Sequence, residues 1–419
     1  MSEFFKIDAH LLLIAIAGIM ALLAAVVPEM LKKLHLSAPI IYLILGGIAF
    51  WISGAGVIKP LRQLEEIKYI TEFVVLVALT NAGLRIKDPF KWSTWKYSFR
   101  LLIIAMPVTI AAATFLGWWV VGFAPATALL FGALISPTDP VLASELQTSE
   151  PGKEDTSKVK LGLTAEAGIN DGLAFPFTWF AILFITKGPD YQNWLGEWFL
   201  YYFLLKIAIG VVVGLLCGWL LYKLIFSISN KDTIGKISRG ILSLALILLP
   251  YALSEIIGGY GFLAVFFAAC IFSDYEKHIE HMNNLHDFNE ELESFVVAVI
   301  FIGTGVFIAM HYELLFDLQI LAVALLMVLV VRPLAGYISF INTGLNHFQR
   351  FALSFYGMRG IGSMFYLAYA LTSAEFDEPK KLMAVTTATI FFSVLIHGVS
   401  ARSVQKRIKK YDATNEDAK

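Results

Sequence analysis

Long apolar runs separated by short polar stretches make up most of this 419-residue chain. A helix needs roughly 20 apolar residues, at a rise of about 1.5 Å each, to cross the hydrocarbon core of a bilayer. Thirteen runs approach that length, although 260–273 is short and 69–84 contains Glu72. They predict membrane helices near 9–27, 38–57, 69–84, 97–121, 124–146, 159–185, 198–226, 238–256, 260–273, 292–310, 318–341, 351–372 and 381–400.

Basic residues between the runs predict the orientation, because Lys and Arg gather in cytoplasmic loops. Thirteen spans with a cytoplasmic C-terminus place the N-terminus outside. Nineteen basic residues then lie inside: Lys32, Lys33, Arg85, Lys87, Lys91, Lys96, Lys153, Lys158, Lys160, Lys231, Lys236, Arg239, Lys277, Arg350, Arg402, Lys406, Arg407, Lys409 and Lys410. Seven lie outside: Lys6, Lys59, Arg62, Lys68, Lys187, Lys380 and Lys381.

Two predicted spans contain helix breakers. The fifth contains "LISPTDPVLA", in which Pro137 and Pro140 each remove a backbone donor. The twelfth contains "YGMRGIGSM", in which three glycines surround Arg359. Irregular backbone survives at membrane depth only where it is buried in protein or lines a cavity. Interrupted spans at corresponding positions of two halves point to the binding site of a transporter.

The spacing of these two spans predicts the fold. They are seven spans apart, and an odd offset inverts the second half relative to the first. We therefore expect an all-α integral membrane protein of about 13 transmembrane helices in two inverted six-helix repeats. Residues 9–185 form the first repeat, 198–226 a linker helix, 238–400 the second repeat and 401–419 a short cytoplasmic tail.

Composition agrees with a membrane protein. Hydrophobic residues make up 58% and charged residues 16% of the chain, and the mean hydropathy is +0.71. A net charge of −1 without a basic face argues against nucleic-acid binding. Cys217 and Cys270 lie inside apolar runs and suggest neither a disulfide nor a metal site. The start "MSEFFKIDAH" lacks the basic region of a signal peptide, so the first run is expected to be retained.

Five charged residues are predicted at membrane depth: Asp139, Glu166, Asp171, Arg332 and Arg359. Each would cost about 2.5–3.5 kcal/mol if left alone at the centre of a helix. Pairing within a buried ionic lattice would explain Glu166, Arg332 and Arg359 as structural residues. Three acids and two bases nevertheless leave one acid over.

Helix geometry indicates which acid is left. Glu166 and Asn170 share a helix face, whereas Asp171 is turned by about 100° from Asn170. Asp139 lies between two prolines, where it can rest against the N-terminal end of a half-helix. Asp171 therefore has no obvious basic partner. A lone buried carboxylate can be neutralised by a proton or by a small cation that prefers oxygen ligands, and Thr138 and the broken fifth span offer such oxygens.

Three motifs together resemble those of a known family. "ISPTDPVLAS", "EAGINDGLAFPF" and "YGMRGIGSM" are similar to motifs of NhaP-like sodium/proton antiporters of the monovalent cation:proton antiporter superfamily, which are related to eukaryotic sodium/proton exchangers. The resemblance covers about residues 9–400. It implies electroneutral exchange of one Na⁺ or Li⁺ for one H⁺, a homodimer in the cell (inner) membrane, a role in pH homeostasis and elevator-like movement of spans 4–6 and 11–13. It implies no cofactor beyond the transported ions.

The resemblance also implies roles for individual residues. Asp171 would carry the proton and the cation, with Asn170 orienting the site and Thr138 supplying an oxygen. Asp139 would neutralise the crossing of the two broken helices. Glu166 and Arg359 would form a bridge that holds Asn170, and Arg332 would be a further buried partner.

Two positions depart from the family pattern and leave the cation open. Relatives often carry Ser where this chain has Ala167, and many carry a carboxylate where it has Asn81. A K⁺(Na⁺)/H⁺ exchanger with the same mechanism is therefore the alternative. An ion-coupled symporter or a channel is a further alternative, but the spans offer neither a continuous polar path nor the donors for an organic solute.

Overall fold

The computed structural model describes residues 9–31, 36–53, 60–86, 88–143, 146, 148, 157–228, 239–276 and 283–416. Some residues named above fall outside this part of the chain. They are Lys6, Lys32, Lys33, Lys59, Lys87, Lys153, Lys231, Lys236 and Lys277, together with the boundary at 238 and the last three residues of the predicted tail.

The described residues are almost entirely helical. The first half contains α1 (Ala9–Leu31), α2 (Ala38–Ser53), η1 (Pro60–Arg62), α3 (Leu64–Leu84), α4 (Trp92–Arg100), η2 (Leu101–Ala105), α5 (Met106–Leu116), η3 (Gly117–Val121), α6 (Pro125–Ile135) and α7 (Lys158–Lys187). It is followed by η5 (Tyr191–Asn193), α8 (Leu195–Glu197), η6 (Trp198–Leu205) and α9 (Lys206–Ile228).

The second half of the chain is also helical in its described residues. It contains α11 (Arg239–Ile257), α12 (Gly261–Glu276), α13 (Asn283–Met310), α14 (Tyr312–Leu315), α15 (Leu318–Leu326), η7 (Met327–Val331), α16 (Arg332–Ser339), α17 (His347–Phe355), α18 (Ile361–Ser373) and α19 (Pro379–Glu416).

Nine helices in the described ranges are long and apolar enough to cross a membrane. Three shorter apolar helices add to them: Ala38–Ile52, Pro125–Ile135 and Gly261–Asp274. The predicted class, an all-α multi-pass membrane protein, is confirmed, whereas the count of thirteen spans and the repeat boundaries stay predictions. Several predicted boundaries move. α3 begins at Leu64 and not at residue 69, since Glu65 and Glu66 occupy the favourable first turn of the helix. α13 begins at Asn283 and not at residue 292, and α19 continues past residue 400 to Glu416.

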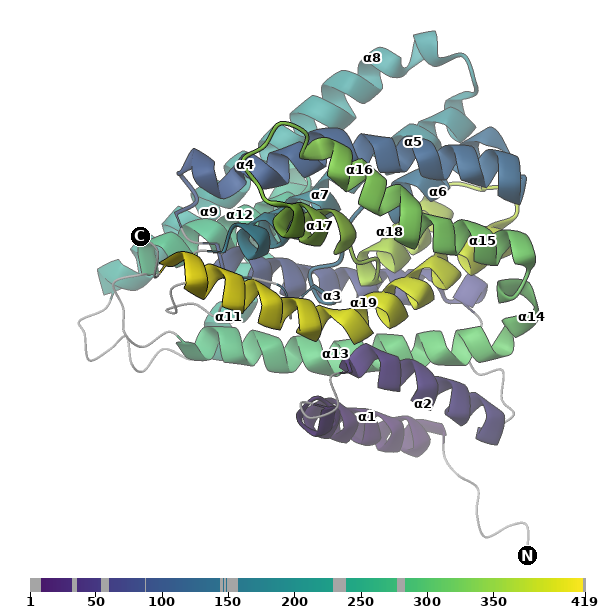
Figure 1. The fold of residues 1–419 in the computed structure, drawn as a ribbon, viewed down its shortest axis with the longest axis horizontal. Coiled ribbons are helices and arrows are strands. Elements are labelled where there is room, and N and C mark those ends of the chain that lie inside the picture. Colours follow the sequence, from purple (N-terminus) through teal and green to yellow (C-terminus); the bar gives the residue numbers. More distant parts are fainter. Residues whose placement is uncertain are drawn as a thin grey trace, which may run out of the picture.

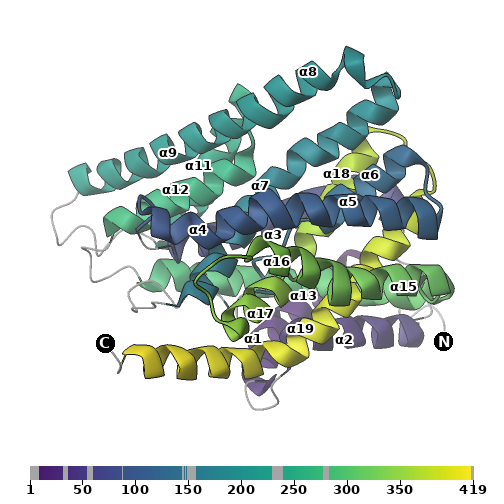
Figure 2. The same ribbon diagram turned by 45° about the horizontal axis from the view of Figure 1, so that its top comes forward.

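The helices pack into two groups. The crossing group consists of α4–α7 and α15–α19, in which α6 contacts α5, α7, α18 and α19. The flanking group consists of α1–α3 and α9–α13, in which α12 packs on α9 and α13 packs on α1 and α2. α1 and α2 lie at the edge of the molecule away from α8 (Figures 1 and 2). Contacts of α3 with α18 and of α7 with α12 join the two groups.

Glycines let helices of the two groups approach closely. A Cβ on Gly168 or Gly172 of α7 would collide with Phe266 or Leu263 of α12. Because lipid provides no hydrophobic drive for helices to associate, close packing over small residues supplies much of the attraction.

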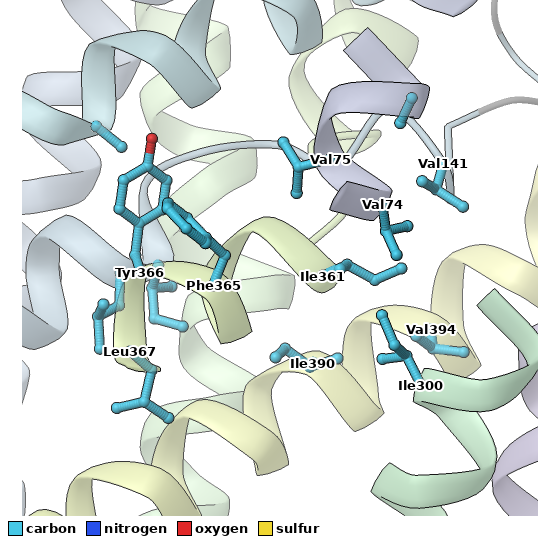
Figure 3. Packing of buried hydrophobic residues seen from close by; sticks show 14 of the residues in the cluster. Val74, Val75, Val141, Ile300, Ile361, Phe365, Tyr366, Leu367, Ile390 and Val394 are labelled. Carbon is cyan, nitrogen blue, oxygen red and sulfur yellow. The ribbon is translucent and has the colours of Figure 1, made fainter. Parts of the chain in front are cut away.

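The interior is also filled with apolar side chains around the start of α18, where Ile361 and Phe365 lie among Val74, Val75 and Ile390 (Figure 3).

Two of the four π-helical segments in the described ranges, η2, η3, η6 and η7, are followed by a proline two residues on. The wide π-helical turn η2 is followed by Met106 and Pro107, and the π-helical turn η7 is followed by Arg332 and Pro333. Proline cannot donate the next backbone hydrogen bond, so the turn before it widens. The η2 and η7 turns lie in predicted spans 4 and 11. These spans are seven apart, as are the two broken spans, 5 and 12.

Candidate functional site

The two broken segments meet through their backbones. α6 ends at Ile135, and non-helical residues lead to Asp139. α17 ends at Phe355, and α18 begins at Ile361. The N–H of Asp139 donates to the carbonyl of Met358 at 2.8 Å, so each break pairs with the other. Irregular backbone that is buried must satisfy its hydrogen bonds in this way.

Asp139 lies at the centre of this meeting point and is 2% exposed. Its Oδ1 accepts from the N–H groups of Val141 and Leu142 at 2.8 and 3.1 Å. Its Oδ2 accepts from the N–H of Ile361, the first residue of α18. Its negative charge therefore faces the partly positive N-terminal end of that half-helix, as predicted from the prolines.

Arg359 belongs to the break between α17 and α18. Its N–H donates to Oγ of Ser393 at 2.7 Å, and its Nη1 donates to the carbonyl of Gly357 at 3.1 Å. His397, one turn further along α19, approaches the carbonyl of Phe355 at 3.1 Å with Nε2. Ser393 and His397 therefore hold the end of α17 and the break. No sequence pattern indicates this role of Ser393, because it lies in an otherwise apolar run.

Glu166 forms its ion pair with Arg332 and not with Arg359. Two N–H···O contacts of 2.8 Å join the guanidinium to the two carboxylate oxygens, and each side chain is 3% exposed. The predicted Glu166–Arg359 bridge is therefore wrong in its partner. Arg332 follows the π-helical turn η7 and reaches across to α7, whereas the guanidinium of Arg359 bonds to its own segment.

Asn170 is not held by that ion pair either. Its Nδ2 donates to Oγ1 of Thr138 at 2.6 Å, and its Oδ1 has no hydrogen-bond partner among the described residues. Asn170 thus connects α7 to the break after α6. The Thr138 hydroxyl oxygen keeps a second lone pair that can accept a proton donor or bind a cation.

Asp171 differs from every other buried carboxylate of the crossing. It is 0% exposed, and within the described ranges neither Oδ1 nor Oδ2 has a hydrogen-bond partner. Among the described residues, the negative charge of Asp139 and the positive charge of Arg359 both act on it. Its backbone carbonyl accepts from the Tyr366 hydroxyl, which fixes α7 against α18. A buried carboxylate in this setting is costly unless a proton or a cation neutralises it.

Each glycine of the twelfth span faces one charged side chain. A Cβ on Gly357 would overlap Nε of Arg332, and a Cβ on Gly360 would overlap Oδ2 of Asp139. A Cβ on Gly362 would lie 2.8 Å from Oδ1 of Asp171. The glycines therefore do more than break the helix, because they let α18 and the preceding backbone approach the three charges.

Two polar side chains of α18 were not predicted. Ser363, which follows Gly362, is 1% exposed, and its Oγ has no partner in the part of the chain that the structure describes. Tyr366 lies one turn further along α18. The quoted motif ends at Met364, so it contained Ser363, but a lone serine in a helix is too common to single out.

Comparisons with known proteins agree with this arrangement. A family model described as "Sodium/hydrogen exchanger, transmembrane" matches residues 18–406. The chain is also similar to the structure of the sodium proton antiporter MjNhaP1 from Methanocaldococcus jannaschii at pH 8. The TM-score is 0.70 at 19% identity, over 95% of this chain and 99% of that chain, so the two share a fold.

Curated relatives include proteins named for different cations. A Na(+)/H(+) antiporter of Schizosaccharomyces pombe is 28% identical over 274 residues, which are 63% of this chain and 57% of that protein. The alignment therefore spans little more than half of that relative. The Na(+)/H(+) antiporter NhaH of Halobacillus aidingensis is 25% identical over 72% of both chains. The K(+)/H(+) antiporter NhaP2 of Shewanella oneidensis is 22% identical over 94% of this chain and 66% of that protein.

Proposed function

The chain belongs to the sodium/hydrogen exchanger family, and from this premise we propose that it is a secondary antiporter that exchanges Na⁺ or Li⁺ for H⁺. The observation that carries this proposal is the buried carboxylate of Asp171, whose two oxygens have no hydrogen-bond partner among the described residues. One such group can hold one proton or one monovalent cation, but not both at once.

Competition at this carboxylate couples the two flows. Only a neutralised Asp171 can move through the low-dielectric protein, because an unpaired buried charge is strongly disfavoured. A cation that arrives on one side displaces the proton, and a proton on the other side displaces the cation. The single carboxylate binds one positive charge, either as a proton or as a cation. One cation is therefore exchanged for one proton, and no net charge crosses the membrane.

The residues around Asp171 have different roles in the proposed exchange. Thr138 offers its hydroxyl oxygen to the cation, and Asn170 positions that hydroxyl through the 2.6 Å bond. Asp139 and Arg359 compensate the two breaks, so their charges are engaged by backbone groups. Glu166 and Arg332 pair with each other and stay outside the exchange.

Alternating access would come from movement between the two helix groups. The crossing group carries both breaks and Asp171, and the flanking group provides the surface on which it could slide as an elevator. The matching π-helical turns before Pro107 and Pro333 support the proposed inverted repeats, 9–185 and 238–400, around the linker helix 198–226. A homodimer in the cell (inner) membrane, with the C-terminus in the cytoplasm, and a role in pH homeostasis complete the proposal.

Exchange of K⁺ is a second candidate. The likeness to a K(+)/H(+) antiporter extends over 94% of this chain, which is more than for the two Na(+)/H(+) antiporters above. Ala167 and Asn81 also lack the additional hydroxyl and carboxylate oxygens that could favour a smaller ion. The mechanism at Asp171 would be the same.

Transport by the purified protein in liposomes tests the proposal. Adding Na⁺ or Li⁺ should dissipate an imposed pH gradient, K⁺ should do so if the second candidate holds, and Asp171→Asn should abolish the effect with each ion. Asp377→Asn is the matched control, because Asp377 is exposed in the loop before α19. Exchange that persists in Asp171→Asn would overturn the carrier assignment, and a dependence of the flux on membrane voltage would overturn one-for-one stoichiometry.

A further inference from the structure

A cavity of about 320 Å³ lies between α3, α13 and the turn that follows the α6 break. Pro140, Val141 and Leu142 form one wall of it, and these residues directly follow Asp139. Asn81 of α3 and Glu293 of α13 form part of the opposite side. The cavity therefore lies directly beside the break that carries Asp139.

Asn81 and Glu293 bring oxygen ligands together inside this cavity. Nδ2 of Asn81 donates to Oε2 of Glu293. Asn81 is 3% exposed, and its Oδ1 has no hydrogen-bond partner among the described residues. An amide carbonyl and a carboxylate are the hard oxygen groups that Na⁺ or K⁺ would take as ligands, by the same preference that governs other hard cations.

The two arginines that line the cavity, Arg85 and Arg402, each bond to groups other than Glu293. Arg85 pairs with Glu290 at 2.5 Å and also donates to the carbonyl of Thr148 at 3.3 Å. Arg402 donates to the carbonyl of Leu31 at 2.7 Å. The carboxylate of Glu293 accepts its hydrogen bond from the neutral amide of Asn81. Among the described residues, it lies within electrostatic reach of one cation, Arg85, and of two further carboxylates, Glu290 and Asp139, so the negative charge around it exceeds the positive charge and attracts a cation.

We propose that Asn81 and Glu293 form a second monovalent-cation site, through which the ion passes on its way to and from Asp171. This site rests on the antiport function proposed above and gives it a further affinity-determining residue. The cation binds between Oδ1 of Asn81 and the carboxylate of Glu293 in the cavity. Its occupation raises the local cation concentration beside the crossing.

Transport kinetics separate this role from that of Asp171. Glu293→Gln should raise the KM for the transported cation about tenfold, the equivalent of roughly 1.4 kcal/mol of lost binding, while kcat stays within about twofold. Glu291 is an exposed glutamate on the same helix, so the control variant Glu291→Gln should leave the KM unchanged. The double variant Asn81→Asp/Glu293→Gln moves the carboxylate to the other side of the same pair and should restore most of the affinity.

A binding measurement adds a readout that does not depend on exchange. In an Asp171→Asn background, NaCl or KCl at matched ionic strength should still raise the thermal unfolding temperature relative to choline chloride. Adding Glu293→Gln should remove that increase. If the wild-type protein shows no exchange, the proposed function is contradicted. The cation-dependent rise in unfolding temperature would still show whether the second cation site exists.

Two outcomes would overturn the second site. One is a KM of Glu293→Gln equal to that of the wild type in a protein that does exchange. The other is a rise in KM that the carboxylate swap fails to reverse, since a merely structural pair would behave in that way. If Glu293→Gln does not accumulate as folded protein, Asn81→Ala removes the carbonyl ligand instead, and an unchanged KM there has the same meaning.

Discussion

Arg332 holds Glu166 through two N–H···O contacts of 2.8 Å, with both side chains 3% exposed. A buried pair of this kind costs about 3–5 kcal/mol when one partner is removed, because the other charge is left uncompensated. The two-pronged geometry also requires the planar guanidinium, which an ammonium group cannot replace. This pair fixes α7 against α16 next to the carrier residue.

A double-mutant cycle should show that the pair, and not Glu166 with Arg359, is the coupled unit. Glu166→Gln and Arg332→Gln should each lower the free energy of unfolding in detergent by about 3–5 kcal/mol, and the double variant should lose much less than their sum. The matched cycle of Glu166→Gln with Arg359→Gln should be closer to additive. A larger coupling in the second cycle would contradict the pairing of Glu166 with Arg332.

Asp139 and Asp171 should respond in opposite ways to the loss of charge. Asp139 accepts three backbone N–H groups, so Asp139→Asn replaces one acceptor with a donor and should cost about 1–3 kcal/mol of stability. The carboxylate of Asp171 has no hydrogen bond to lose among the described residues, and Asp171→Asn removes a buried charge.

Thermal unfolding of the two variants measures this difference. The unfolding temperature of Asp139→Asn should fall below that of the wild type, whereas that of Asp171→Asn should equal or exceed it even though exchange is lost. The same destabilisation in both variants would mean that Asp171 has a structural partner.

The sequence predicted the fold class and both breaks, because lipid imposes rules that leave a clear pattern in apolar runs, prolines and loop charges. It also identified Asp171 as the surplus acid by counting charges. The prediction was wrong about the partner of Glu166, because a count of charges does not distinguish Arg332 from Arg359. Only the path of α16 past α7 decides which guanidinium reaches the carboxylate.

The pair of Asn81 and Glu293 shows a second limit of the sequence. Asn81 was noticed as a departure from the family pattern, but Glu293 was not, because it lies 212 positions away at the start of a span. Long-range pairing of this kind depends on how α3 packs against α13. No local pattern in either helix records it.

The glycines of the twelfth span should not tolerate a methyl group. Gly357→Ala should destabilise the protein by about 1–3 kcal/mol, as overpacking against Arg332 requires a backbone shift. Gly362→Ala brings a Cβ to 2.8 Å from Oδ1 of Asp171, so it should raise the KM for the cation more than it changes stability. Gly344→Ala is the control, since a Cβ there meets nothing within 4 Å. Equal behaviour of Gly362→Ala and Gly344→Ala in transport would contradict the close approach of α18 to the carrier.

Ala167 offers a direct test of ion selectivity. It is 1% exposed and lies one helical turn before Asp171, so its side chain shares a helix face with the carrier. Ala167→Ser adds a hydroxyl oxygen that can bind the cation, and the smaller Na⁺ gains more than K⁺ from an additional close oxygen. The ratio of KM for K⁺ to KM for Na⁺ should therefore rise by roughly threefold, the equivalent of about 0.65 kcal/mol. Ala181→Ser, a buried substitution further along α7, controls for the addition of a hydroxyl to this helix, where it can bond to a preceding carbonyl. A ratio that moves equally in both variants would show that the position one turn before Asp171 has no part in cation choice.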